Sequence, residues 1–89
     1  MARSRILVVD DELNIREALV TLLEKKQYQV RGARTAEEAL DEMEATAADL
    51  ILTDLNLPDG SGRTLLARVR SQRLPLPVVV LTGASNEEV

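Results

Sequence analysis

The chain has 89 residues, 45% of them hydrophobic, with a net charge of −4 and neither cysteine nor histidine. This composition predicts one small globular domain and excludes a disordered chain, a disulfide scaffold, and zinc or triad chemistry that needs thiolate or imidazole. Because phosphate binding needs a basic surface, the acidic balance also argues against nucleic acid as a direct partner.

The first predicted element is a strand over residues 6–9, an apolar run in which three of four residues are β-branched. Asp10, Asp11 and Glu12 follow it directly. A helix then begins, because apolar residues recur at helical spacing and two lysines close the pattern. We expect its buried stripe to consist of Leu13, Ile15, Ala18, Leu19, Leu22 and Leu23.

Residues 28–33 predict a second strand, and the segment after it carries a capping box. In this motif Thr35 is the N-cap and Glu38 lies three residues later. The following helix has a largely acidic outer face, which we interpret as a solvated surface. Its inner stripe is Ala36, Ala39, Leu40 and Met43.

A third strand is predicted over residues 49–53, ending at Asp54, where proline and glycine residues break the backbone into a loop. A third helix is expected over residues 63–73 and an apolar strand over 78–81, followed by a turn at Thr82, Gly83 and Ala84. The alternation of strands and helices predicts an α/β fold with a parallel sheet and right-handed crossovers.

Acidic residues end the first and third strands, and this places them together if the strand order is the flavodoxin-like 2-1-3-4. In that doubly wound sheet Asp10 and Asp11 lie beside Asp54. Clustered carboxylates repel one another, and a hard divalent cation relieves the repulsion. All-oxygen ligation suits Mg²⁺, with Mn²⁺ as a substitute, and the backbone carbonyl of Asn56 is a further candidate ligand.

The same geometry predicts phosphoryl chemistry. A metal on one oxygen of Asp54 leaves its other oxygen as a nucleophile toward phosphorus. The hydroxyl of Thr82, at the end of the neighbouring strand, is placed to bond a phosphoryl oxygen, and Gly83 allows a backbone N–H to approach the same group.

These motifs resemble the receiver (phospho-acceptor) domain of bacterial two-component response regulators. The stretches that carry the resemblance are ILVVDDE (6–12), DLNLPDGSG (54–62) and VLTG (80–83). The resemblance implies that Asp54 is phosphorylated and that Thr82 is the switch hydroxyl. It also implies that Asp11, Asp54 and the Asn56 carbonyl bind Mg²⁺ directly, while Asp10 acts through water.

Family members have a fifth strand that begins with a lysine, and this chain stops before that strand. We therefore expect residues 1–89 to be an incomplete receiver domain, with weakened phosphorylation and with self-association or homodimerisation through an exposed edge strand. The implied partners are a sensor histidine kinase and an output domain outside this chain, with a DNA-binding transcription activator as one candidate. The resemblance implies a signalling module rather than an enzyme.

Two alternatives stay open from the sequence. One is a fragment of a Mg²⁺-dependent aspartyl-phosphate phosphohydrolase, because Asp54 after an apolar strand is similar to the haloacid-dehalogenase nucleophile motif. The other is a pseudo-receiver that serves only as an interaction scaffold. The chain shows no signal peptide and no apolar stretch near the twenty or so residues that cross a membrane, so we expect a cytoplasmic protein without a membrane partner.

Overall fold

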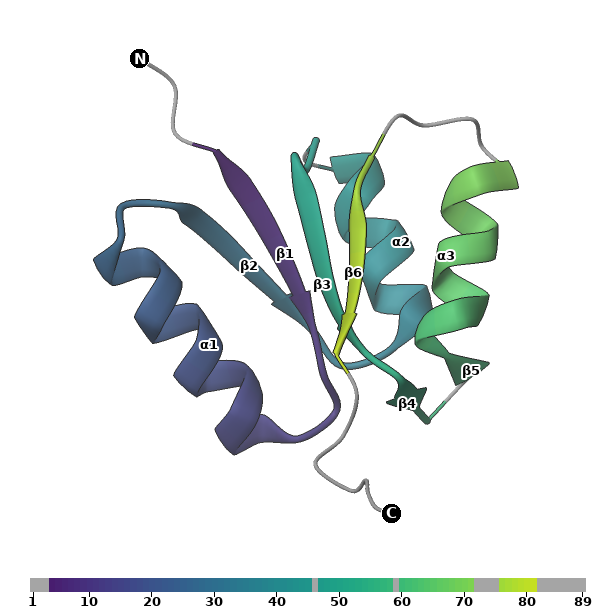
Figure 1. Ribbon diagram of the computed structural model, residues 1–89, viewed down its shortest axis with the longest axis horizontal. Coiled ribbons are helices and arrows are strands. Elements are labelled where there is room, and N and C mark those ends of the chain that lie inside the picture. Colours follow the sequence, from purple (N-terminus) through teal and green to yellow (C-terminus); the bar gives the residue numbers. More distant parts are fainter. Residues whose placement is uncertain (1–3, 46, 59, 72–75, 82–89) are drawn as a thin grey trace.

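The computed structural model describes residues 4–45, 47–58, 60–71 and 76–81 and forms an open β-sheet with helices on both faces (Figure 1). The predicted alternation of strands and helices is confirmed within these ranges. In chain order the elements are β1 (Arg5–Val9), α1 (Leu13–Lys25), β2 (Gln29–Ala33), α2 (Ala36–Ala45), β3 (Leu50–Asp54), β4 (Asn56–Leu57), β5 (Gly60–Ser61), α3 (Gly62–Ser71) and β6 (Val78–Leu81).

The main sheet has the strand order β2-β1-β3-β6, and every neighbouring pair is parallel. This is the predicted flavodoxin-like order, with β6 as the fourth strand of the sheet. Val9 at the end of β1 pairs with Ala33 of β2 and with Thr53 of β3. The carboxyl ends of β1 and β3 therefore lie side by side, and the residues that follow them meet at one edge of the sheet.

One face of the sheet is covered by α2 and α3, and the other by α1 (Figure 1). The packed hydrophobic core lies on the α2 and α3 side. Its buried members are Leu7, Val9, Ala33, Ala36, Ala39, Ile51, Leu57, Leu65 and Val69. Successive residues of a strand face opposite sides, so Ile6 and Val8, which are also buried, face α1.

The predicted buried stripe of α1 is wrong in part. No residue of this helix is buried, and Leu13, Ile15 and Leu22 are 54%, 45% and 50% exposed. Leu19 and Leu23 are half-buried. In the described part of the chain α1 packs on β1 and β2 and has no neighbouring helix on its face. The sheet therefore covers only part of the apolar side of this helix.

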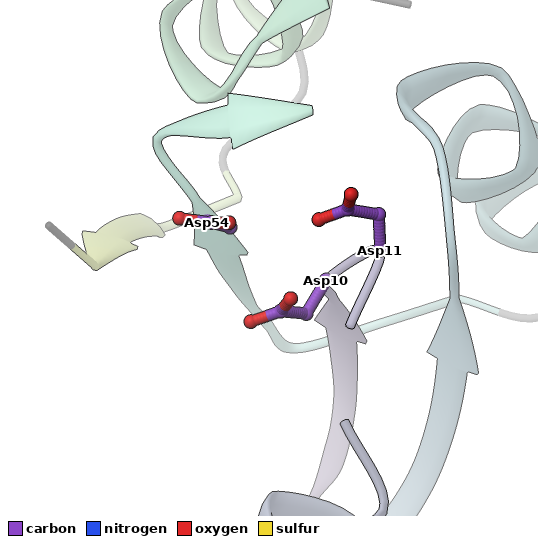
Figure 2. A group of neighbouring side chains, drawn as sticks. All are labelled: Asp10, Asp11 and Asp54. Carbon is purple, nitrogen blue, oxygen red and sulfur yellow. The ribbon is translucent and has the colours of Figure 1, made fainter. Parts of the chain in front are cut away.

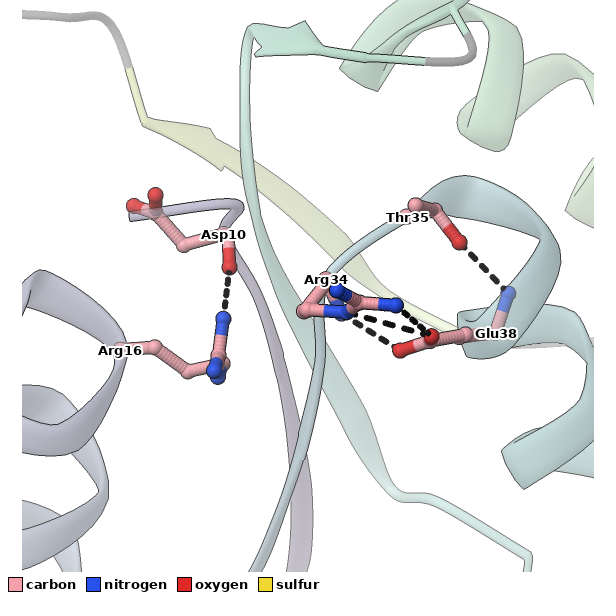
Figure 3. Close-up of polar contacts among 5 residues, drawn as sticks. All are labelled: Asp10, Arg16, Arg34, Thr35 and Glu38. Atoms are coloured by element: carbon pink, nitrogen blue, oxygen red, sulfur yellow. Dashed lines mark hydrogen bonds and ion pairs between the residues drawn. The ribbon is translucent and has the colours of Figure 1, made fainter. Parts of the chain in front are cut away.

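The N-terminus of α2 is capped largely as predicted. Thr35 Oγ1 accepts a hydrogen bond from the Glu38 backbone N–H at 3.0 Å (Figure 3). The Glu38 carboxylate, however, accepts from the backbone N–H of Arg34, at 3.0 Å, and not from that of Thr35. Ala36 and Ala39 are buried, so the predicted inner stripe of this helix is confirmed there.

Several predicted boundaries shift. The segment expected to be an open loop contains the antiparallel hairpin β4–β5, and α3 begins at Gly62 rather than at residue 63. The second strand begins at Gln29 rather than at Tyr28. The third strand runs one residue later than predicted, because Asp54 still pairs with Leu81 of β6. The last predicted turn, at residues 82–84, lies outside the described residues.

None of the helices in the described ranges is long and apolar enough to cross a bilayer.

Candidate functional site

Three carboxylates meet at the carboxyl edge of the sheet, where the sequence predicted them (Figure 2). Asp10 and Asp11 follow β1, and Asp54 is the last residue of β3. One carboxylate oxygen from each of the three lies within 4.8 Å of the others. We call Asp10, Asp11 and Asp54 the acidic trio.

The members of the acidic trio differ in burial. Asp10 is buried, at 5% exposure, Asp54 is half-buried and Asp11 is exposed. The backbone of Asp10 donates to the Ala33 carbonyl at 3.0 Å, and its Oδ1 accepts from the Glu12 backbone N–H at 2.9 Å. Asp10 is therefore held by the turn into α1 as well as by β2.

Burial raises the pKa of Asp10 above its ordinary value, and the hydrogen bond from the Glu12 backbone opposes this shift. The negative charges of Asp54, Asp11 and Glu12 raise that pKa further. The ionised acidic trio is thus costly without a cation. Three hard oxygen donors of like charge within 4.8 Å of one another fit a divalent ion such as Mg²⁺, which prefers carboxylate and water ligands.

Close packing positions the backbone of Asp54. A Cβ atom added to Gly62 would lie 2.7 Å from the Asp54 carbonyl oxygen, so only glycine fits at the start of α3 without a shift of the backbone. Thr53, fully buried, donates from Oγ1 to the same carbonyl at 3.1 Å. The sequence pattern marked Gly62 only as a loop breaker, whereas the structure makes it the point where α3 meets β3.

The remaining predicted site residues lie outside the acidic trio. Asn56 is exposed and opens β4, where it pairs with Ser61. Thr82 and Gly83 lie outside the described residues, although Leu81, which precedes them, pairs with Asp54. Their parts in metal and phosphoryl binding stay predictions.

One contact of the site was missed from the sequence. Nη1 of Arg16, on α1, donates to the backbone carbonyl of Asp10 at 2.8 Å (Figure 3). Arg16 is not a member of the predicted apolar stripe of its helix, yet the residue is half-buried. No spacing rule marks this contact, because it depends on how α1 folds back beside β1.

Comparisons of the sequence and of the structure with known proteins point to the same family. Residues 6–89 match the family described as the response regulator receiver domain. The chain is 39% identical over 83 residues to the response regulator protein PilR of Pseudomonas aeruginosa, covering 93% of this chain and 19% of that protein. It is 41% identical over 82 residues to the transcriptional regulatory protein DltR of Streptococcus agalactiae, covering 92% and 37%. The chain thus spans less than two fifths of the length of either relative.

Solved structures agree with the sequence relatives. A response regulator receiver protein from Pseudomonas putida matches with a TM-score of 0.88 and 34% identity, over 97% of this chain and 73% of that one. The response regulator TrrA from Thermotoga maritima, solved in complex with Mg²⁺-BeF, matches with a TM-score of 0.85 and 36% identity, over 92% and 71%. Because the family match extends over nearly the whole chain, from residue 6 to residue 89, this protein belongs to the response regulator receiver domain family.

Proposed function

We propose that Asp54 accepts a phosphoryl group from a sensor histidine kinase, with Mg²⁺ held by the acidic trio, and that this modification switches an output domain or a dimer interface. The observation that carries the proposal is the convergence of Asp10, Asp11 and Asp54, one oxygen each, within 4.8 Å at the carboxyl edge of the sheet. A carboxylate nucleophile beside two further carboxylates is suited to metal-assisted phosphoryl transfer.

Each residue has a distinct part in this proposal. Bound Mg²⁺ supplies positive charge that offsets the charge on the transferring phosphoryl oxygens. The ion would be held directly by Asp11, by one oxygen of Asp54 and by the Asn56 carbonyl. Asp10 acts through water, in keeping with its burial and with the hydrogen bond that its Oδ1 already accepts from Glu12.

The other oxygen of Asp54 attacks phosphorus. A new bond forms between this oxygen and phosphorus while the bond from phosphorus to the donor breaks, and the donor leaves with that electron pair. The Thr82 hydroxyl and the Gly83 backbone N–H are proposed to bond the phosphoryl oxygens. Support for this part is that Leu81, directly before Thr82, pairs with Asp54.

Phosphorylation of the 89-residue chain by acetyl phosphate tests the proposal. With Mg²⁺, and with Mn²⁺ in its place, we expect a single phosphoryl group by intact mass, mapped to Asp54 by peptide analysis. Asp54→Asn should take up none. Asp49→Asn is the matched control, because Asp49 lies directly before the opposite end of β3 and caps the Arg5 backbone N–H at 2.8 Å.

The same assay separates the alternatives. Uptake at another residue, or equal uptake by Asp54→Asn, would contradict the proposal. Repeated release of phosphate from a phosphomonoester would favour a phosphohydrolase. A folded chain that binds neither Mg²⁺ nor phosphoryl groups would favour a pseudo-receiver scaffold.

We also propose that the output of the whole protein is transcriptional. Two of the relatives are named as transcriptional regulatory proteins, DltR of Streptococcus agalactiae and the alkaline phosphatase synthesis regulator PhoP of Bacillus subtilis. The chain covers 37% and 35% of their lengths. The proposed DNA-binding activator would therefore be a separate domain, and its fusion to residues 1–89 should bind DNA in a phosphorylation-dependent way.

Self-association of the 89-residue chain is a further part of the proposal. In the described sheet β6 is an outer strand, and Val79 on it is 43% exposed. An apolar edge of this kind recruits another strand. Light scattering should detect dimers or larger species that diminish in Val79→Lys, and a sharp monomer at high concentration would contradict this expectation.

A further inference from the structure

We infer that Arg16 is a positioning residue for the metal site: its guanidinium holds the Asp10 carbonyl and thereby the turn that carries Asp10 and Asp11. Gly32 on β2 leaves the room in which the Arg16 side chain lies. The inference rests on the proposed Mg²⁺ site and goes beyond it, since neither residue belongs to the acidic trio.

The first observation is the set of bonds around the Asp10 peptide. Its N–H donates to the Ala33 carbonyl of β2 at 3.0 Å, and its carbonyl accepts from Arg16 Nη1 at 2.8 Å (Figure 3). Arg16 is itself anchored in the first turn of α1, where its backbone N–H donates to the Glu12 carbonyl at 2.9 Å. Hydrogen bonds therefore connect the turn between β1 and α1 to β2 on one side and to α1 on the other.

The second observation is the close approach of Gly32 to Arg16. A Cβ atom added to Gly32 would lie 3.2 Å from Arg16 Cδ and 3.3 Å from Cγ, tighter than ordinary van der Waals contact. Glycine weakens a strand interior, and it is used where another group must approach the backbone closely. Here that group is the aliphatic part of the Arg16 side chain, which lies against Gly32 while its guanidinium reaches the Asp10 carbonyl.

Positioning and simple electrostatics predict opposite effects on metal affinity. A nearby positive charge opposes the binding of a cation, so removal of the Arg16 charge would by itself tighten Mg²⁺ binding. Loss of the hydrogen bond frees the Asp10 carbonyl and loosens the turn, which weakens binding, because groups that orient metal ligands contribute strongly to affinity. Weaker Mg²⁺ binding after loss of Arg16 would indicate positioning, and tighter binding would indicate charge repulsion.

The test is Mg²⁺ titration by calorimetry on the metal-free 89-residue chain, at a temperature where circular dichroism shows every variant folded. We expect Arg16→Gln to bind Mg²⁺ about tenfold more weakly than the parent, as for other residues that orient metal ligands. Arg16→Lys keeps the charge but not the guanidinium geometry, and it should also bind more weakly. Arg31→Gln is the matched control, because it removes the same charge from an exposed position on β2 that pairs with Glu42. Its affinity should be unchanged.

Gly32→Ala tests the second half of the inference through non-additivity. This variant should weaken Mg²⁺ binding by displacing Arg16, whereas the double variant Arg16→Gln/Gly32→Ala should bind no more weakly than Arg16→Gln alone. Equal or tighter binding by Arg16→Gln, with the parent binding Mg²⁺ normally, would overturn the inference and leave the proposed function intact. A folded parent that binds no Mg²⁺ would instead overturn the proposed function itself.

Discussion

The two faces of the sheet differ in how completely their helices are packed. On one face α2 and α3 lie side by side, and buried residues from both helices and from four strands form the core. On the other face α1 has no buried residue, although its apolar residues also recur at helical spacing. Helical periodicity therefore predicts which side of a helix is apolar, whereas burial depends on the neighbours that this side meets.

The difference extends to the site. The acidic trio lies at the carboxyl edge between the two faces, and a contact from each side holds it. Gly62 of α3 packs against the Asp54 carbonyl, and Arg16 of α1 bonds the Asp10 carbonyl. The contact from the tightly packed face holds the backbone of Asp54, and the contact from the loosely packed face holds the turn that carries Asp10 and Asp11.

The largest expected effect contrasts two leucines. Leu65 of α3 is fully buried, so Leu65→Ala should lower the free energy of unfolding by about 3 kcal/mol, the usual cost of a cavity in a core. Leu22→Ala makes the same chemical change at a half-exposed position of α1 and should cost less than about 0.5 kcal/mol. Urea denaturation followed by circular dichroism measures both. Equal losses would show that the two faces are equally well packed.

Gly62→Ala should have the next largest effect, about 2 kcal/mol, because the added methyl group overlaps the Asp54 carbonyl and forces the backbone to shift. The same shift should weaken phosphorylation of Asp54 by acetyl phosphate. Arg63→Ala, at the adjacent exposed position, is the control and should change neither quantity. Normal phosphorylation of a folded Gly62→Ala variant would contradict the role of this contact.

Asp10→Asn should stabilise the metal-free chain at neutral pH. The folded state raises the pKa of Asp10 above its ordinary value of 3.8, so the folded state holds this proton more tightly than the unfolded chain does. Stability is then lost as pH rises from 3.8 through the folded pKa, and the loss persists above it. Asparagine removes this loss and keeps an acceptor for the Glu12 N–H.

Thermal unfolding of parent and Asp10→Asn across the acid-to-neutral range checks this. Without metal the variant should melt a few degrees higher at neutral pH, and the difference should disappear in acid. Saturating Mg²⁺ should reverse the order, because only the parent has the full acidic trio. A variant that is less stable than the parent at neutral pH without metal would contradict the account.

The smallest expected effect concerns the end of α1. Gln27 follows this helix with a φ of 71°, a left-handed conformation that glycine adopts without steric cost. Gln27→Gly should therefore raise the free energy of unfolding by roughly 0.5 kcal/mol, after the entropic cost of glycine is subtracted. Gln27→Ala is the control and should give no gain. A loss of stability in Gln27→Gly would contradict the expectation.

The order of elements and the acidic trio were predictable from the sequence for a simple reason. Buried parallel strands are short apolar runs, and here two of them end in aspartate, so topology alone brings Asp10 and Asp54 together. The capping box at Thr35 is likewise a local signal, and its bond to the Glu38 N–H is present.

What the sequence did not reveal depends on contacts between distant segments. The exposed side of α1, the hairpin β4–β5 and the one-residue shift of β3 follow from which element packs or pairs with which. The roles of Gly62 and Arg16 also depend on distant contacts. A Cβ atom added to Gly62 would lie 2.7 Å from the Asp54 carbonyl oxygen, and Arg16 donates a hydrogen bond to the Asp10 carbonyl. Patterns of spacing within one element do not record such contacts.

The most direct test of the central claim is the melting temperature of the parent and of Asp54→Asn in three conditions: without metal, with Mg²⁺, and with Mg²⁺ plus beryllium fluoride, which imitates a phosphoryl group on aspartate. A ligand that binds only the folded state must stabilise it. We expect a stepwise rise of the melting temperature in the parent and no response to beryllium fluoride in Asp54→Asn, with Asp49→Asn behaving as the parent. A parent indifferent to Mg²⁺ and beryllium fluoride, or an Asp54→Asn variant that responds equally, would contradict this expectation.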